Sequence, residues 1–204
     1  MKKLTAVLMI VLISGTFSSF GQNKDLKSSG QKNDQVNLNN DFYISYGTGS
    51  VFYFIDNEGM TANSMSGTFT VGFSRSLNQV IAVGFQMHYI RIDRTGNNYL
   101  YSSYPPTTTK EEMTDNLWEG IANVRFRYLN RPSFCMYSGI GMGVTMDFYQ
   151  KTYDNSSPKG QKLLPAAQLT LLGFRVGRAL SFFGEFGVGT SNILNAGISY
   201  KFGE

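Results

Sequence analysis

Side chains of alternating character recur along the last two-thirds of the sequence. Between residues 134 and 149, large apolar side chains alternate with cysteine, tyrosine, glycine, threonine and aspartate. Successive side chains of a β-strand point to opposite sides, so this segment is predicted to be a strand with one apolar face and one small or polar face. The pattern recurs about eight times, which restricts the fold to an all-β sandwich or barrel.

We predict eight strands, at about 40–54, 63–76, 79–94, 114–130, 134–149, 163–177, 179–190 and 192–203. In the sixth, the alternation loses its phase between Leu172 and Arg175, which predicts a β-bulge. Several of these strands are longer than those of most soluble folds. Together they predict an all-β, eight-stranded antiparallel transmembrane barrel of the up-and-down type.

The N-terminus has the features of a cleaved secretion signal. Two lysines precede a short apolar stretch that ends at Ile13, and small residues lead up to Gly21. We predict cleavage after Gly21, which removes residues 1–21, because roughly ten apolar residues are too few to span a membrane. The polar residues 22–39 are expected to form a flexible periplasmic segment that precedes a barrel over residues 40–204.

The expected connections alternate in length along the chain. Short turns are predicted at 76–78, 130–132 and 177–178, and longer polar loops at 55–62, 95–113 and 150–162. Outer-membrane barrels alternate short periplasmic turns with longer external loops in this way. A short connection near 190–192 breaks the trend. Because the strand number is even, both termini are expected in the periplasm.

Aromatic residues are predicted to form two girdles at the ends of the strands. The external group comprises Phe52, Tyr53, Phe54, Tyr99, Tyr101, Trp118, Phe148 and Tyr153. The periplasmic group comprises Phe42, Tyr128, Phe134, Phe174, Tyr200 and Phe202. Such girdles bracket the apolar band of a membrane barrel. The alternative is a soluble lipocalin-like barrel, whose apolar face would point inward. Its outer surface would then consist mainly of glycine, serine and threonine, which cannot cover a soluble surface of this size but fit a narrow lumen.

Composition agrees with a lipid-facing surface. Charged residues make up 16% of the chain and aromatic residues 14%. A formal charge of +4 is too small to indicate nucleic-acid binding, and no basic run is interleaved with aromatic residues. The single cysteine, Cys135, cannot form an internal disulfide and is expected to line the lumen. No residue pattern indicates a metal or another cofactor.

The signal, the strand pattern and the closing sequence ISYKFGE resemble the small outer-membrane barrels of the OmpA and OmpX type. The sequence is also similar to the porin-like "outer membrane protein beta-barrel domain" family common in Bacteroidetes, over roughly residues 40–204. This resemblance implies a place in the bacterial outer membrane, contact with its lipid and lipopolysaccharide, and insertion by the barrel assembly machinery. It implies no catalytic residues.

The inward face is expected to carry a network of ionisable side chains. Its candidate members are His88, Glu119, Arg125, Arg127, Asp147, Glu185 and Lys201. Eight strands enclose a lumen just wide enough for side chains to fill, so these charges must pair or meet water. Arg125 and Glu185 are expected to pair across the barrel, and His88 and Glu119 to be neighbours. We interpret the network first as a structural plug and second as a gated narrow path.

Glycines on the inward face allow two interpretations. Those concerned are Gly47, Gly49, Gly139, Gly141, Gly143, Gly187 and Gly189. They can accommodate the large side chains of Tyr43, Tyr137 and Phe183 and ease the curvature of the wall. Alternatively, they leave a small pocket, open to the exterior, for a small apolar molecule.

An enzyme would need a nucleophile and a histidine, with an acid to orient the ring. His88 is the single histidine, Ser66, Thr68 or Thr70 on the adjacent strand could be the nucleophile, and Glu119 the acid. Serine and threonine populate every inward face, so such proximity is expected by chance. We therefore predict that the protein is not an enzyme.

The 95–113 loop is rich in tyrosine, serine, threonine and proline. Its side chains Tyr99, Tyr101 and Tyr104 suit contact with an extracellular ligand or partner, because amphipathic aromatic groups bind at modest entropic cost. The predicted function is a structural, envelope-stabilising or surface-interaction role of a monomeric barrel with a largely plugged lumen. The alternative is a narrow porin-like channel or carrier for a small solute.

Overall fold

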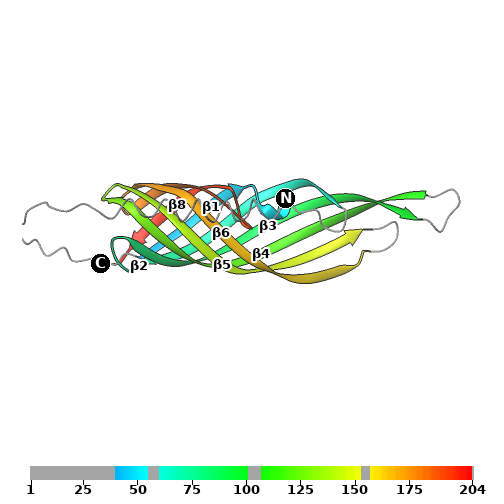
Figure 1. Ribbon diagram of the computed structural model, residues 1–204, viewed down its shortest axis with the longest axis horizontal. Helices are drawn as coiled ribbons and strands as arrows, with labels where there is room; N and C mark the ends of the chain where they lie inside the picture. Colours follow the sequence, from blue (N-terminus) through cyan, green and yellow to red (C-terminus); the bar gives the residue numbers. More distant parts are fainter. Residues whose placement is uncertain (1–39, 55–59, 101–106, 153–156, 204) are drawn as a thin grey trace, which may run out of the picture. The chain divides into compact units, whose positions relative to one another are not determined.

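The computed structural model describes residues 40–54, 60–100, 107–152 and 157–203 of the chain. Eight antiparallel strands follow one another in sequence order around a closed barrel (Figure 1). They are β1 (Asn40–Thr48), β2 (Thr61–Ser76), β3 (Ile81–Leu100), β4 (Thr107–Arg131), β5 (Phe134–Thr152), β6 (Lys159–Gly177), β7 (Leu180–Gly189) and β8 (Leu194–Phe202). β1 pairs with β8 to close the wall, with Asn40 opposite Phe202. This confirms the predicted all-β, eight-stranded antiparallel barrel.

The barrel turns its apolar face outward. In β5, Met142 and Met146 are 70% and 51% exposed, whereas Thr145 is fully buried on the inner side. β1 follows the same rule, since buried and exposed residues alternate without interruption from Asp41 to Thr48. A lipocalin-like barrel would have the opposite arrangement, so the structure excludes that alternative.

The strands differ in length around the wall. β3, β4, β5 and β6 contain 19 to 25 residues, whereas β1, β7 and β8 contain nine or ten. We call the end of the barrel that holds Asn40 and Phe202 the terminal end, and the opposite end the loop end. At the loop end, the four long strands continue beyond the short ones, as the green and yellow strands of Figure 1 show.

Strand replaces most of the predicted loops at 95–113 and 150–162. β3 continues to Leu100, which pairs with Thr107 of β4. In the same way, Gln150 of β5 pairs with Lys159 of β6. Both faces of these extensions are mostly polar, so the apolar–polar alternation from which we assigned strands is missing there. Backbone pairing with the neighbouring strand extends the sheet without help from an apolar face.

The predicted first strand, 40–54, is too long. β1 ends at Thr48, and Gly49 then takes a positive φ of 79° that turns the chain. A single helical turn, α2 (Val51–Phe54), follows. Phe52 therefore belongs to no outer girdle and lies over the lumen, where it packs against buried apolar residues. Within the described ranges, no helix has the length and apolar character needed to cross a membrane.

The predicted bulge in β6 is confirmed, slightly before its expected position. Leu171 and Leu172 are both exposed on the outer face, and the register of β6 against β7 shifts between Thr170 and Leu172. The sequence pattern does not indicate the further register shifts, which lie between Ala62 and Ser64 and between Met65 and Thr68 of β2 and between Arg127 and Leu129 of β4. The predicted short turns lie close to their expected positions, at 77–80, 132–133 and 178–179.

Candidate functional site in the barrel lumen

An ion pair between β4 and β7 occupies the centre of the lumen. Arg125 Nη2 lies 3.4 Å from Glu185 Oε1, as the sequence led us to expect. Tyr137 donates its hydroxyl to Glu185 Oε1 at 2.7 Å, and Asn195 Nδ2 donates to Oε2 at 3.2 Å. The guanidinium and these two hydrogen-bond donors surround the carboxylate, which offsets part of the cost of burying its charge.

Aromatic rings enclose the other partner of this ion pair. Arg125 Cζ lies 4.6 Å from the ring centroid of Tyr43 and 5.4 Å from that of Tyr137. Tyr43 in turn meets Phe183 edge to face, with their centroids 5.6 Å apart. Cation–π contact stabilises a guanidinium in such a place, where water is largely excluded. We call Tyr43, Arg125, Tyr137 and Glu185 the central layer.

Two glycines outside the predicted set make room for the tyrosines. A Cβ on Gly72 would lie 2.2 Å from Tyr43 Cζ, and one on Gly173 would lie 2.4 Å from Tyr137 Cε2. Any larger residue there would overlap the ring. The sequence pattern assigns this role to Gly139 and its companions, but Gly139 faces the stem of Arg125 instead. The register between neighbouring strands decides which glycine lies under which ring, and the sequence pattern alone does not give this register.

The space beside the predicted glycine track is nearly full. A cavity of about 10 Å³ lies there, lined by residues that include Gly139, Gly141, Gln86 and Gln168. That volume is enough for roughly one water molecule. A small apolar molecule does not fit in this cavity.

A cluster of hydroxyl groups lies between the central layer and the loop end. Glu119 accepts hydrogen bonds from Thr145 Oγ1, at 2.8 Å, and from Ser191 Oγ. Ser191 belongs to the short connection between β7 and β8, which is buried within the lumen. Thr68 Oγ1 donates to the carbonyl oxygen of Ser191. The short connection thus helps to fill the barrel.

His88 also lies in this cluster. It is opposite Glu119 in the register of β3 and β4, and its Nδ1 lies 2.8 Å from Thr70 Oγ1. The nucleophile–histidine contact that we considered for an enzyme is therefore present. The hydroxyls of Thr145 and Ser191, however, bond the acid that would have to orient the ring. His88 is 1% exposed, so a substrate has no approach to it.

An apolar cap that the sequence analysis missed covers the lumen at the loop end. Phe52 and Tyr53 of α2 pack against a buried cluster that comprises Ile90, Ile92 and Leu117. Arg94 fixes the cap, because its Nη2 donates to the carbonyl oxygen of Phe52 at 2.7 Å. The Nε of the same guanidinium lies 2.7 Å from Asp115 Oδ2. We call Phe52, Tyr53 and this cluster the outer cap.

One signal could have revealed the outer cap. Ile90 and Ile92 fall on the otherwise polar inward face of β3 and are fully buried. Apolar side chains on a lumen face need something to cover them. The aromatic residues of α2, which begins at Val51 shortly after β1 ends, provide this cover.

The remaining predicted residues also face inward. Asp147 is 3% exposed and lies opposite Leu117 in the register of β4 and β5. Arg127 and Lys201 are half-buried at the terminal end. The side chains of Tyr99, Tyr101 and Tyr104 lie outside the described residues, as do the predicted segments 1–21 and 22–39. In the described ranges, no three His, Cys, Asp or Glu side chains come together as metal ligands.

Comparison with known proteins gives similarity in structure only. No family model and no curated protein matches the sequence. The chain is similar in structure to Ail, the attachment invasion locus protein of Yersinia pestis, with a TM-score of 0.45 and 11% identity, over 81% of this chain and 99% of that one. It is also similar to the N-terminal β-barrel domain of Pseudomonas aeruginosa OprF, with a TM-score of 0.39 and 8% identity, over 82% and 100% of the two chains.

Proposed function

We propose that the chain is a bacterial outer-membrane barrel with a structural, envelope-stabilising or surface-interaction role. It is exported by a cleaved signal peptide, inserted by the barrel assembly machinery as a monomer, and has both termini in the periplasm. In this arrangement the terminal end faces the periplasm and the loop end faces the exterior. The protein is not an enzyme in this proposal.

The observation that carries the proposal is a belt of exposed apolar side chains around a closed barrel. The belt includes Phe42, Ile44, Phe69, Phe73, Phe85, Met87, Ile140, Met142, Val144, Phe174, Phe182, Phe186, Leu194 and Ile198. A belt that encircles the wall is far larger than the apolar patches that soluble monomers expose. Lipid and the acyl chains of lipopolysaccharide would cover it, and closure of the barrel removes the free sheet edges that lipid does not tolerate.

Closure of the lumen at two levels supports a structural role over transport. The central layer places a paired guanidinium and carboxylate between two buried tyrosines. The outer cap closes the loop end with apolar side chains that Arg94 holds in place. Beyond the short strands, β3–β6 offer an external surface on which an extracellular partner can bind.

Two measurements test the proposal. After separation of the cell envelope on a density gradient, the protein is expected in the outer-membrane fraction, and recovery as a soluble periplasmic protein would overturn it. In planar bilayers the purified barrel is expected to be silent. Steady single-channel steps would favour the alternative, a narrow porin-like channel or carrier for a small solute.

A further inference from the structure

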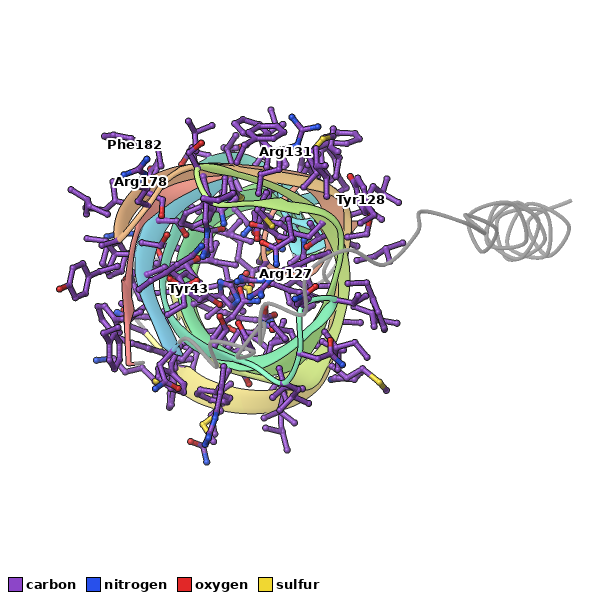
Figure 2. The ribbon with its side chains drawn as sticks, turned by 90° about the vertical axis from the view of Figure 1, so that its left-hand side faces the viewer. Tyr43, Arg127, Tyr128, Arg131, Arg178 and Phe182 are labelled. Carbon is purple, nitrogen blue, oxygen red and sulfur yellow. The ribbon has the colours of Figure 1, made fainter. Side chains whose placement is uncertain are left out.

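Three basic side chains lie on the inner wall at the terminal end of the barrel. They are Arg127 of β4, Arg175 of β6 and Lys201 of β8, and we call them the basic mouth. Figure 2 looks into this end and shows Arg127 inside the opening and its neighbour Tyr128 outside the wall. Arg175 is 6% exposed, whereas Arg127 and Lys201 are half-buried. The cations therefore line an opening and not the outer surface.

The three cations are close enough to influence one another. Arg175 interacts electrostatically with both Arg127 and Lys201. All three also interact with Cys135, which lies among them and is 5% exposed. Four strands of the wall, β4, β5, β6 and β8, thus bring one thiol and three positive charges together.

The basic mouth has more positive than negative charge. Asp41 forms an ion pair with Arg175 and is also close enough to interact electrostatically with Arg127 and Lys201. Deeper in the lumen, Arg125 is paired with Glu185. Among the residues that the structure describes, neither Arg127 nor Lys201 has an ion-pair partner. The Nε of Arg175 is buried without a hydrogen-bond acceptor. Two positive charges and one buried donor are therefore left for an outside group to satisfy.

A small anion would satisfy them. Like charges in a narrow, partly dry opening repel one another more strongly than they do in water. A guanidinium presents paired N–H groups that match the oxygen atoms of a phosphate, and a lysine ammonium adds a point charge. The closed wall separates the opening from surrounding lipid, so the anion must be a soluble one.

We propose that the basic mouth binds a small soluble dianion of the phosphate type, either inorganic phosphate or a phosphate monoester. Arg127, Arg175 and Lys201 donate to its oxygen atoms, and the two excess positive charges match its charge. Anion binding at this site depends only on the folded barrel. Access to the site from the periplasm rests on the proposed function, which sets the orientation of the barrel in the membrane.

The test is calorimetric titration of the full mature chain, refolded in a neutral detergent, with inorganic phosphate at low ionic strength. We expect saturable binding that weakens as salt is added. Folding is checked for every variant by the change in gel migration on heating. Arg127→Gln and Lys201→Gln are each expected to weaken binding roughly tenfold or more, since each removes a charge-assisted contact.

Arg131→Gln and Arg178→Gln are the matched controls. Both arginines lie at the same end of the barrel but point away from the opening (Figure 2). These variants should bind phosphate as the parent protein does. Absence of saturable binding, or equal weakening in the control variants, would overturn the proposal. Either result would leave the structural role untouched, because envelope fractionation and bilayer silence test that role separately.

Cys135 provides a second readout of the same site. Sulfonatoethyl and trimethylammonioethyl thiosulfonates carry opposite charges, and both form a mixed disulfide with a thiol. The anionic reagent should modify Cys135 faster, and phosphate should slow it. In the Arg127→Gln/Lys201→Gln variant both effects should disappear. Equal rates for the two reagents in the parent protein would contradict an anion-selective mouth.

Discussion

Arg125 and Glu185, which lie on strands far apart in the sequence, meet inside the barrel with their side chains only 7% and 8% exposed. Removal of one partner leaves the other charge buried and unpaired. We expect Glu185→Gln to lower the free energy of unfolding by about 3–5 kcal/mol, and Arg125→Met/Glu185→Leu to lower it less. Urea titration in detergent micelles measures both.

The matched control for this prediction is the ion pair between Arg91 and Asp93, whose side chains are 52% and 43% exposed. Asp93→Asn should change the free energy of unfolding by less than about 1 kcal/mol, because solvent screens an exposed pair. A loss in Glu185→Gln no larger than this would show that the central pair adds little.

Gly173→Ala should destabilise the barrel, because the new Cβ would lie 2.4 Å from Tyr137 Cε2. Overpacking of this kind costs about 1–3 kcal/mol. Adding Tyr137→Leu should recover part of the loss in the same urea titration. Gly120→Ala is the control, since its Cβ would meet only the exposed ring of Phe85, at 3.3 Å. Equal losses in the two alanine variants would contradict this packing.

The outer cap and the central layer each close the lumen, so we predict that opening only one of them gives no ion conduction. Arg94→Ala removes the contact that holds Phe52 in the outer cap, and Arg125→Ala removes the cation of the central layer. Each single variant should stay silent in planar bilayers, whereas the double variant should show small current steps. Arg91→Ala, at an exposed position, is the control. Conduction by either single variant would mean that only one layer closes the lumen.

The outer belt can be tested by placing a charge on it. Val144 is 49% exposed on the outer face of β5. Val144→Arg should lower the free energy of unfolding in lipid vesicles by about 2–4 kcal/mol if the side chain lies near the bilayer centre. Gln161→Arg, at an exposed position on the extension of β6, should change it little. Equal effects at the two positions would argue against a membrane belt.

Most of the barrel could be predicted because its apolar face leaves a period-2 pattern in the sequence. Met142, Val144 and Met146 show this well, and their strand was assigned correctly. The pattern fails where no apolar face is needed, which is why it predicts a loop where the polar extension of β3 continues to Leu100. It also fails at Val51–Phe54, because an apolar aromatic run suits a strand and an inward-folded cap equally well.

The candidate site could be predicted in part. Inward positions follow from the alternation, which places Arg125, Glu185, His88 and Glu119 in the lumen. It predicts the ion pair between Arg125 and Glu185 and the neighbouring positions of His88 and Glu119. The alternation does not predict contacts that depend on connections between strands or on strand register. Ser191 lies in a connection, and Gly173 lies under Tyr137 only because a one-residue bulge sets the register of β6. Register shifts of this kind depend on contacts between strands and cannot be predicted from the sequence of one strand.

The seam between β1 and β8 has a consequence for how the barrel folds. These strands are the first and last of the wall, with nine residues each, and their pairing must wait until every intervening hairpin is in place. Contacts so distant in sequence form late, because the loop that they close is long. The seam is therefore expected to be the rate-limiting step of folding.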